Sequence, residues 1–172
     1  MSENTEAAAA PGPMAGLAIT AIIVVLLVAW IAIWIGLLKM SDTTLVGAFM
    51  FLWYWANNEQ LQFNRLVPAM AGSLVGIGIA WFLWYGPAAY GSAGLIGSLA
   101  VLIAALYLDV TKMVPIAVNT ATMLFLTLAA APLVQLQVDW VELVKSTVLG
   151  GLFFAAAVYG LQKLAARFAP GS

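Results

Sequence analysis

The residues from Met14 to Leu38 form an apolar run that holds no charged side chain. This run is longer than the roughly 20 residues that a helix needs to cross the hydrocarbon layer of a bilayer. Inside that layer every backbone N–H and C=O group must find its partner within the protein, which only helices and closed barrels achieve. The centre of the run, Ile22 to Val28, is apolar on every face, as in a helix with wide lipid contact. We therefore predict a helical membrane protein.

The same reasoning extends to the rest of the chain. Of its 172 residues, 65% are hydrophobic and 8% are charged, whereas a soluble domain carries about 25% charged residues. Further apolar segments follow at about residues 43–56, 66–85, 93–108, 114–133 and 141–164. The predicted fold is thus an all-α membrane protein with six transmembrane helices in one domain, residues 14–168. We expect a disordered N-terminal tail over residues 1–13 and a short C-terminal tail over residues 169–172.

The chain contains no cysteine and no histidine. This composition excludes disulfides, thiol chemistry and the usual ligands of zinc, haem and iron–sulfur clusters, so we expect no metal and no cofactor. Membrane-embedded enzymes generally need histidine, cysteine or paired acids. The acidic residues here are scattered, and only Glu59 and Asp109 are placed to meet, so we do not expect an enzyme. A net charge of −1 gives no basic surface for nucleic acid.

Two polar links interrupt the apolar segments, and a proline follows each of them. Asn57–Arg65 is the densest polar run and is followed by Pro68, whereas Asp109–Met113 is a weaker echo followed by Pro115. The apolar segments before the links are short, because residues 43–56 would span only about 21 Å of a hydrocarbon layer about 30 Å thick. Polar groups are thereby brought to membrane depth. Short segments in matching halves of a chain indicate a central site in a small transporter.

We predict that the polar groups of both links gather near the cytoplasmic side, because amides and charges at this depth are costly unless they pair or face water. The amides are the better candidates for a solute site, since they bind neutral polar molecules without attracting ions. The candidate residues are Asn57, Asn58, Glu59, Asn64, Arg65, Asp109 and Lys112 from the links, Asn119 deeper in the membrane, and Trp53, Trp55 and Tyr107 along the approach.

Structural interpretations compete at several of these positions. Glu59 with Arg65, and Asp109 with Lys112, are pairs of opposite charge that would simply hold the links together, which is at least as well supported as a solute site. Asn119, in the middle of the segment 114–133, is equally consistent with an interhelical hydrogen bond and with a pore lining. The tryptophans before the first link fit an interface belt better than the aromatic collar of a pore.

Aromatic residues also mark the ends of the predicted helices. Trp30 and Trp34 lie one turn apart near a helix end, and we interpret them as residues at headgroup level rather than as a cofactor-stacking pair. Trp84, Tyr90 and Trp140 are expected on the same side of the membrane as Trp34. Nearby in the chain, Glu142 and Lys145 are expected to snorkel or to pair with each other.

Basic residues favour one orientation in the membrane. With six helices both termini share a side, and on that side we place Arg65, Lys112, Lys163 and Arg167, leaving Lys39 and Lys145 on the other. This bias predicts that both termini lie in the cytoplasm. Small residues spaced one turn apart favour close helix packing and a symmetric homo-oligomer; they are Gly72/Gly76, Gly94/Ser98 and Gly151/Ala155.

An internal duplication is a further interpretation. Setting Val67-Pro68 on Val114-Pro115 superposes the second and third predicted helices on the fourth and fifth, with the polar links between them. Gly72-Ser73 then lies against Asn119-Thr120, so the halves agree in pattern more than in identity. Such a repeat would be parallel, about an axis along the membrane normal.

The chain resembles a family of bacterial inner-membrane proteins, the domain-of-unknown-function family numbered 1097. The resemblance is carried by the order of short helices, by Gly47–Phe51 with the aromatic residues after it, by Asp139-Trp140 and by Ser146–Phe153. It covers most of the six predicted helices. The family's apolar, aromatic and Gly-rich link after the second helix is replaced here by the polar run Asn57–Arg65. The family name implies no activity.

Three classes of function compete on these observations. The first is an inner-membrane channel or transporter for a small polar solute, lined by amides, hydroxyls and aromatic rings. The second is a non-catalytic binding or scaffold subunit of a larger membrane complex, such as a small substrate-capturing component of a vitamin transporter. The third, a membrane-embedded enzyme, is the least supported because the acids are scattered.

Overall fold

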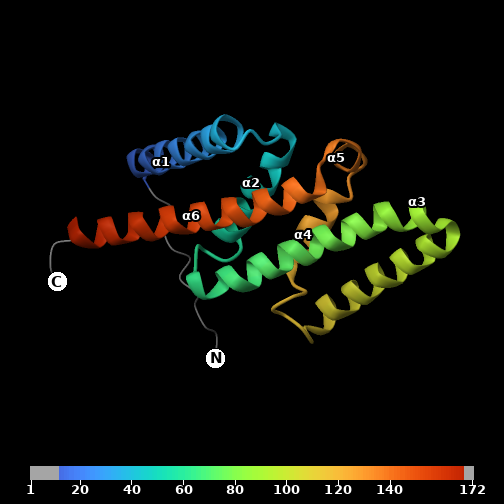
Figure 1. The fold of residues 1–172 in the computed structure, drawn as a ribbon. Coiled ribbons are helices and arrows are strands. Elements are labelled where there is room, and N and C mark those ends of the chain that lie inside the picture. The colour runs from blue at the N-terminus through green and yellow to red at the C-terminus, as the bar shows by residue number, and fades with distance from the viewer. Residues whose placement is uncertain (1–11, 169–172) are drawn as a thin grey trace, which may run out of the picture.

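The computed structural model describes residues 12–168, and every regular element in them is a helix. The elements are, in chain order, α1 (Pro13–Ile31), the π-helical turn η1 (Ala32–Leu37), the 3₁₀ turn η2 (Asp42–Thr44), α2 (Leu45–Asn57), the 3₁₀ turn η3 (Phe63–Arg65), α3 (Leu66–Thr111), α4 (Thr120–Ala129), α5 (Pro132–Gln137) and α6 (Trp140–Phe168). Figure 1 shows their arrangement. The predicted all-α class is confirmed. Most of the predicted N-terminal tail, and all of the C-terminal one, lie outside the described residues.

Three stretches are long and apolar enough to cross a membrane, judged by length and composition: Gly16–Leu37, Phe63–Thr111 and Trp140–Arg167. The remaining apolar helices are shorter. With 13 residues α2 is about 20 Å long, and with 10 residues α4 is about 15 Å long. The six-span topology therefore stays a prediction.

The long helix α3 reverses direction at Gly91, which lies in the link between the predicted segments 66–85 and 93–108. Helical structure continues through Pro87, and the reversal is made at Gly91, with φ 59° and ψ −135°. This backbone region is open to glycine because it lacks a Cβ atom. Two antiparallel arms result, residues 66–90 and 92–111, and they form the hairpin seen in Figure 1.

The two arms of α3 touch through small residues. A Cβ atom on Gly94 would collide with the backbone of Gly86, so only glycine permits this approach. The Ser98 hydroxyl donates to the carbonyl of Phe82 at 2.9 Å and is itself buried. Close approach through glycine and serine is the usual basis of helix packing in membranes.

The short helix α4 packs on the first arm of α3 and runs in the same direction. Gly72 lies against the side chain of Asn119, and Gly76 lies against the backbone of Thr122 and Leu126. Beside this contact is the main buried cluster, which includes Phe51, Tyr54, Trp55, Ile77 and Phe125. The parallel course of the two segments is compatible with the predicted repeat.

Helix α2 runs parallel to the first half of α6, again through glycines. A Cβ atom on Gly47 would meet the Thr147 hydroxyl, and one on Gly150 would collide with Ala48. The Ser146 hydroxyl also accepts a hydrogen bond from the Ala48 N–H at 3.3 Å. These contacts hold α2 against α6, and α3 packs on both helices.

Trp30 and Trp34, which we predicted to lie at headgroup level, are buried inside the protein, at 3% and 0% exposure, so their rings do not face lipid. The rings stack on each other with centroids 5.5 Å apart, and Trp30 also packs on Phe153 at 5.4 Å. The link after η1 folds back over Trp34, whose indole N–H donates to the Ser41 carbonyl at 2.9 Å and to the Thr44 hydroxyl at 3.1 Å. Through these rings α1 is anchored to α2 and α6.

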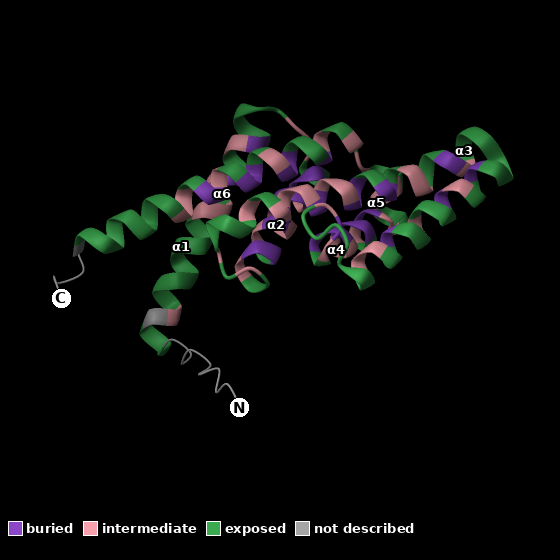
Figure 2. Cartoon of the chain, turned by 90° about the horizontal axis from the view of Figure 1, so that it is seen from below, coloured by how far each residue is buried: buried purple, intermediate pink, exposed green. Residues whose placement is uncertain are grey.

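Away from this anchor the helices separate. Figure 2 shows the N-terminal part of α1 and the C-terminal part of α6 as exposed helix extending beyond the packed centre. The faces of α1, α2 and α6 that point toward one another in this region are apolar, and a groove lies between them.

Candidate functional site

The first polar link folds back over the end of α2. The Tyr54 hydroxyl donates to one carboxylate oxygen of Glu59 at 2.8 Å, and the other oxygen lies 3.7 Å from Nε of Arg65. The buried Trp55 donates its indole N–H to the Gln62 carbonyl at 3.0 Å and meets Phe63 edge-on at 5.4 Å. The predicted ion pair between Glu59 and Arg65 is therefore formed. Trp55 is buried under the link and holds it, and it does not line an open path to a site.

The second link is held by its own ion pair. Lys112 Nζ donates to Asp109 Oδ1 at 2.8 Å, and Lys112 ends α3 in the left-handed region with φ 53°. Tyr107 is 59% exposed on the outer face of the hairpin. Across the described part of the chain, no hydrogen bond or ion pair joins this link to the first one. Glu59 and Asp109 thus bond to separate partners.

Asn119 does not lie in the middle of a helix, as the segment 114–133 predicts. It is the N-cap of α4, and its side-chain oxygen accepts from the Ala121 N–H at 2.9 Å. Its amide nitrogen donates to the carbonyls of Pro68 and Pro115, each at 3.0 Å. The helix starts late because the stretch after Pro115 is irregular and Asn119 supplies the cap. Of the two roles considered for Asn119, the structure shows the interhelical hydrogen bond.

The amides of the first link face outward. Asn57 Nδ2 donates to the Trp53 carbonyl at 2.9 Å, one turn back on α2. Asn58 and Asn64 are exposed, and within residues 12–168 their side chains form no hydrogen bond. The predicted cluster is therefore divided among two ion pairs, one helix cap and separate exposed amides.

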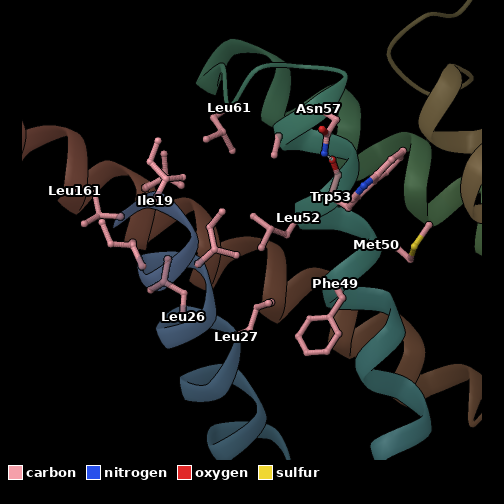
Figure 3. Close-up of a pocket in the computed structure, with 14 residues that line it drawn as sticks. Ile19, Leu26, Leu27, Phe49, Met50, Leu52, Trp53, Asn57, Leu61 and Leu161 are labelled. Carbon is pink, nitrogen blue, oxygen red and sulfur yellow. Dashed lines mark hydrogen bonds between the residues drawn. The ribbon is translucent and has the colours of Figure 1, made fainter. Parts of the chain in front are cut away.

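Two of the predicted site residues, Trp53 and Asn57, do border a common space. It is a groove of about 610 Å³ between α1, α2 and the C-terminal half of α6 (Figure 3). Leu26 and Leu27 of α1 form one wall, and Phe49 and Trp53 of α2 form the facing one. On α6, Val158 and Leu161 contribute, and Asn57 and Leu61 lie at the end nearest the first link.

The chemistry of this groove follows from its lining, which is apolar except for the amide of Asn57 and the indole N–H of Trp53. None of the lining side chains is ionisable, so the groove contains no acid or base for proton transfer. In the part of the chain that the structure describes, no group of three acidic residues could hold a metal ion. An apolar cavity of about 300–1,000 Å³ with a few polar groups is typical of small-molecule sites. The arrangement therefore suits the binding of a largely apolar molecule.

The size of the groove also limits what enters it. A helix with its side chains is about 10–12 Å across, so one turn occupies roughly 420–610 Å³. The groove is therefore no larger than one to one and a half turns of helix. A chain-like or small molecule fits within these dimensions.

Sequence reasoning missed the apolar residues of the groove, although one signal was present. Phe49, Trp53 and Asn57 are spaced by four residues and so share one face of α2. This face ends in the amide and is not the face that packs on α6. The opposite wall has no such signal, because α1 is apolar all round.

The fold and the groove define an all-α protein of membrane-spanning composition with a lateral apolar site. No protein-family model matches the chain, and no curated protein and no solved structure shows significant similarity to it. The resemblance to the domain-of-unknown-function family numbered 1097 stays a prediction.

Proposed function

We propose that this protein is a non-catalytic binding subunit of the bacterial inner membrane, which takes an amphiphilic molecule from the bilayer into the groove between α1, α2 and α6. The observation that carries the proposal is an apolar space of about 610 Å³ with a single amide, Asn57, at one end. Such a site holds the hydrophobic body of a ligand by burial and fixes its direction through the polar group.

The proposal includes the predicted six-span topology. The spans would be α1, α2, the two arms of α3, α4 and α6, which places both polar links on one side. The short helices α2 and α4 are accommodated because the links beside them satisfy their polar groups within the chain, as the Glu59–Arg65 pair and the Asn119 cap illustrate. The basic residues then place both termini in the cytoplasm.

The ligand class follows from Asn57. One N–H of its amide is engaged by the Trp53 carbonyl, which leaves the side-chain oxygen and the second N–H for a ligand. With no charge in the lining, an ionic head group would be poorly compensated. We therefore propose an amphiphile with a neutral head group that both donates and accepts hydrogen bonds, such as a hydroxyl.

Binding of a long-chain fatty alcohol to the detergent-solubilised protein, measured by native mass spectrometry, tests this proposal. The fatty-acid anion of equal chain length serves as the charged comparison and should bind more weakly. Asn57→Leu removes one hydrogen bond and should weaken alcohol binding about 2- to 12-fold. Ala56→Phe fills the groove and should abolish binding, whereas Ala104→Phe, on the exposed second arm of α3, is the matched control and should not. Equal binding by Ala56→Phe and the parent protein would contradict the proposal.

A channel or transporter for a small polar solute is the second candidate, supported by the exposed amides of Asn58 and Asn64. Because these amides face away from the buried core, the pathway would lie between copies in a homo-oligomer. Uptake of neutral solutes into proteoliposomes by the parent protein, and loss of uptake in Asn58→Ala with Asn64→Ala, is the expected result. A monomer by mass measurement in nanodiscs would exclude this arrangement.

A further inference from the structure

A second groove, of about 550 Å³, lies between the first arm of α3 and the start of α6. Leu74, Ile77 and Gly78 line it from α3, and Val141, Val144 and Lys145 line it from α6. It is remote from the first groove, which borders α6 at Val158 and Leu161. Lys145 is the only charged group in its lining, and the remaining side chains are apolar or aromatic.

Lys145 is an exposed cation whose charge is not balanced by its neighbours on α6. Among residues 12–168 it forms no ion pair, so the predicted pairing with Glu142 is not formed. Glu142 instead accepts from the Ser41 N–H at 2.8 Å and lies 3.4 Å from the Thr44 hydroxyl. Asp139 accepts from the Glu142 N–H at 2.9 Å, which caps α6. Both nearby carboxylates thus bond groups other than Lys145, which leaves its ammonium group available to an external anion.

Aromatic rings mark the end of this groove as the level of lipid headgroups. Trp81 and Trp140 border the groove; Trp81 stacks on Tyr85 at 4.9 Å, and Trp140 lies 6.1 Å from Trp84. Such belts of tryptophan and tyrosine are found at the membrane–water interface. Lys145 lies five residues after Trp140, which is about 8 Å along the helix axis. A lysine side chain that extends toward the interface covers most of this distance.

We propose that this second groove binds one anionic phospholipid, with its phosphate on Lys145 and an acyl chain between α3 and α6. The acyl chain occupies the space beside Gly78, where an added Cβ atom would meet nothing within 4 Å. The charge of Lys145 selects a headgroup with net negative charge over a zwitterionic one. The aromatic belt and Lys145 together fix the depth of the lipid.

The test is native mass spectrometry of the protein released from nanodiscs that contain equal amounts of phosphatidylglycerol and phosphatidylcholine. The measured quantity is the ratio of the two lipids bound. Lys145→Gln should reduce the preference for phosphatidylglycerol about fivefold, the effect of one basic residue at an anionic surface. Lys39→Gln is the matched control, since Lys39 is exposed and lies outside the groove, and it should leave the ratio unchanged.

A second variant tests the contribution of the groove to lipid binding independently of the charge of Lys145. Gly78→Leu places a side chain in open space, so it should fold normally and should reduce binding of both lipids while Lys145 is retained. An equal loss of preference in Lys39→Gln and Lys145→Gln would overturn the proposal, because it would show general surface attraction. Displacement of the lipid by inorganic phosphate alone, or burial of the groove in a dimer that Gly78→Leu dissociates, would also overturn it.

Discussion

Replacement of Asn119 by alanine provides a direct test of how the irregular stretch before α4 is held. The asparagine side chain joins three segments, because its oxygen caps α4 and its nitrogen binds the carbonyls of Pro68 in α3 and Pro115 in the stretch itself. Gly72 of α3 lies against this amide and leaves no room for a Cβ atom. At this position α3 therefore has no side chain that could take over the hydrogen bonds of the amide. Asn119→Ala should therefore loosen α4 from the first arm of α3.

The size of the effect follows from the contacts. Loss of an N-cap side chain costs about 1 kcal/mol. Each side-chain hydrogen bond between membrane helices is worth about 0.6 kcal/mol on average, so two bonds to carbonyls add about 1.2 kcal/mol. The expected loss in the free energy of unfolding is about 2 kcal/mol. Asn119→Ser retains a capping hydroxyl that is too short to reach both carbonyls, so it should lose only about 1.2 kcal/mol.

The assay is reversible unfolding by sodium dodecyl sulfate in mixed micelles, followed by circular dichroism. Asn64→Ala is the control, because Asn64 is exposed and its side chain makes no hydrogen bond with the described residues; its effect should stay within about 0.5 kcal/mol. If Asn119→Ala is no less stable than Asn64→Ala, the structural role assigned to this amide is wrong and the pore-lining role gains support.

Two further predictions concern the hairpin and the topology. Gly94→Ala should destabilise the protein by about 1–3 kcal/mol through overpacking against Gly86, whereas Gly97→Ala, where an added Cβ atom meets nothing, should be neutral or slightly stabilising in the same unfolding assay. Reporter fusions after Ser172 and at Ala89 should report opposite sides of the membrane, and a shared side would contradict the six-span topology.

Local patterns in the sequence predicted part of the structure well. Uninterrupted apolar runs are sufficient for helices, because a backbone in lipid has few alternatives. The pairs Glu59–Arg65 and Asp109–Lys112 were also predictable, since their members are close in the chain and opposite in charge. These features depend on residues that are close together in the sequence.

The features that sequence reasoning missed depend on tertiary contacts. Trp34 is buried because the link at Ser41 folds over it, and nothing in the spacing of the tryptophans indicates that fold. The late start of α4 has a visible signal, since Asn119 followed by Thr122 is a capping pattern, but the apolar residues before it conceal the boundary. The two grooves arise from the distances between helices, which composition does not contain.

The pairing of α2 with α6 has a consequence for the order of events during synthesis. The Ser41 N–H meets Glu142 across 101 residues of chain, and Ala48 meets Ser146 across 98. At about 5–20 residues per second, α2 must wait roughly 5–20 s before its partner is made. During that interval its glycine face is uncovered and open to contact with other nascent helices. A chain that stops before Glu142 would therefore leave α1 and α2 without the surface on which they pack, and it should be recognised as a substrate by membrane proteases.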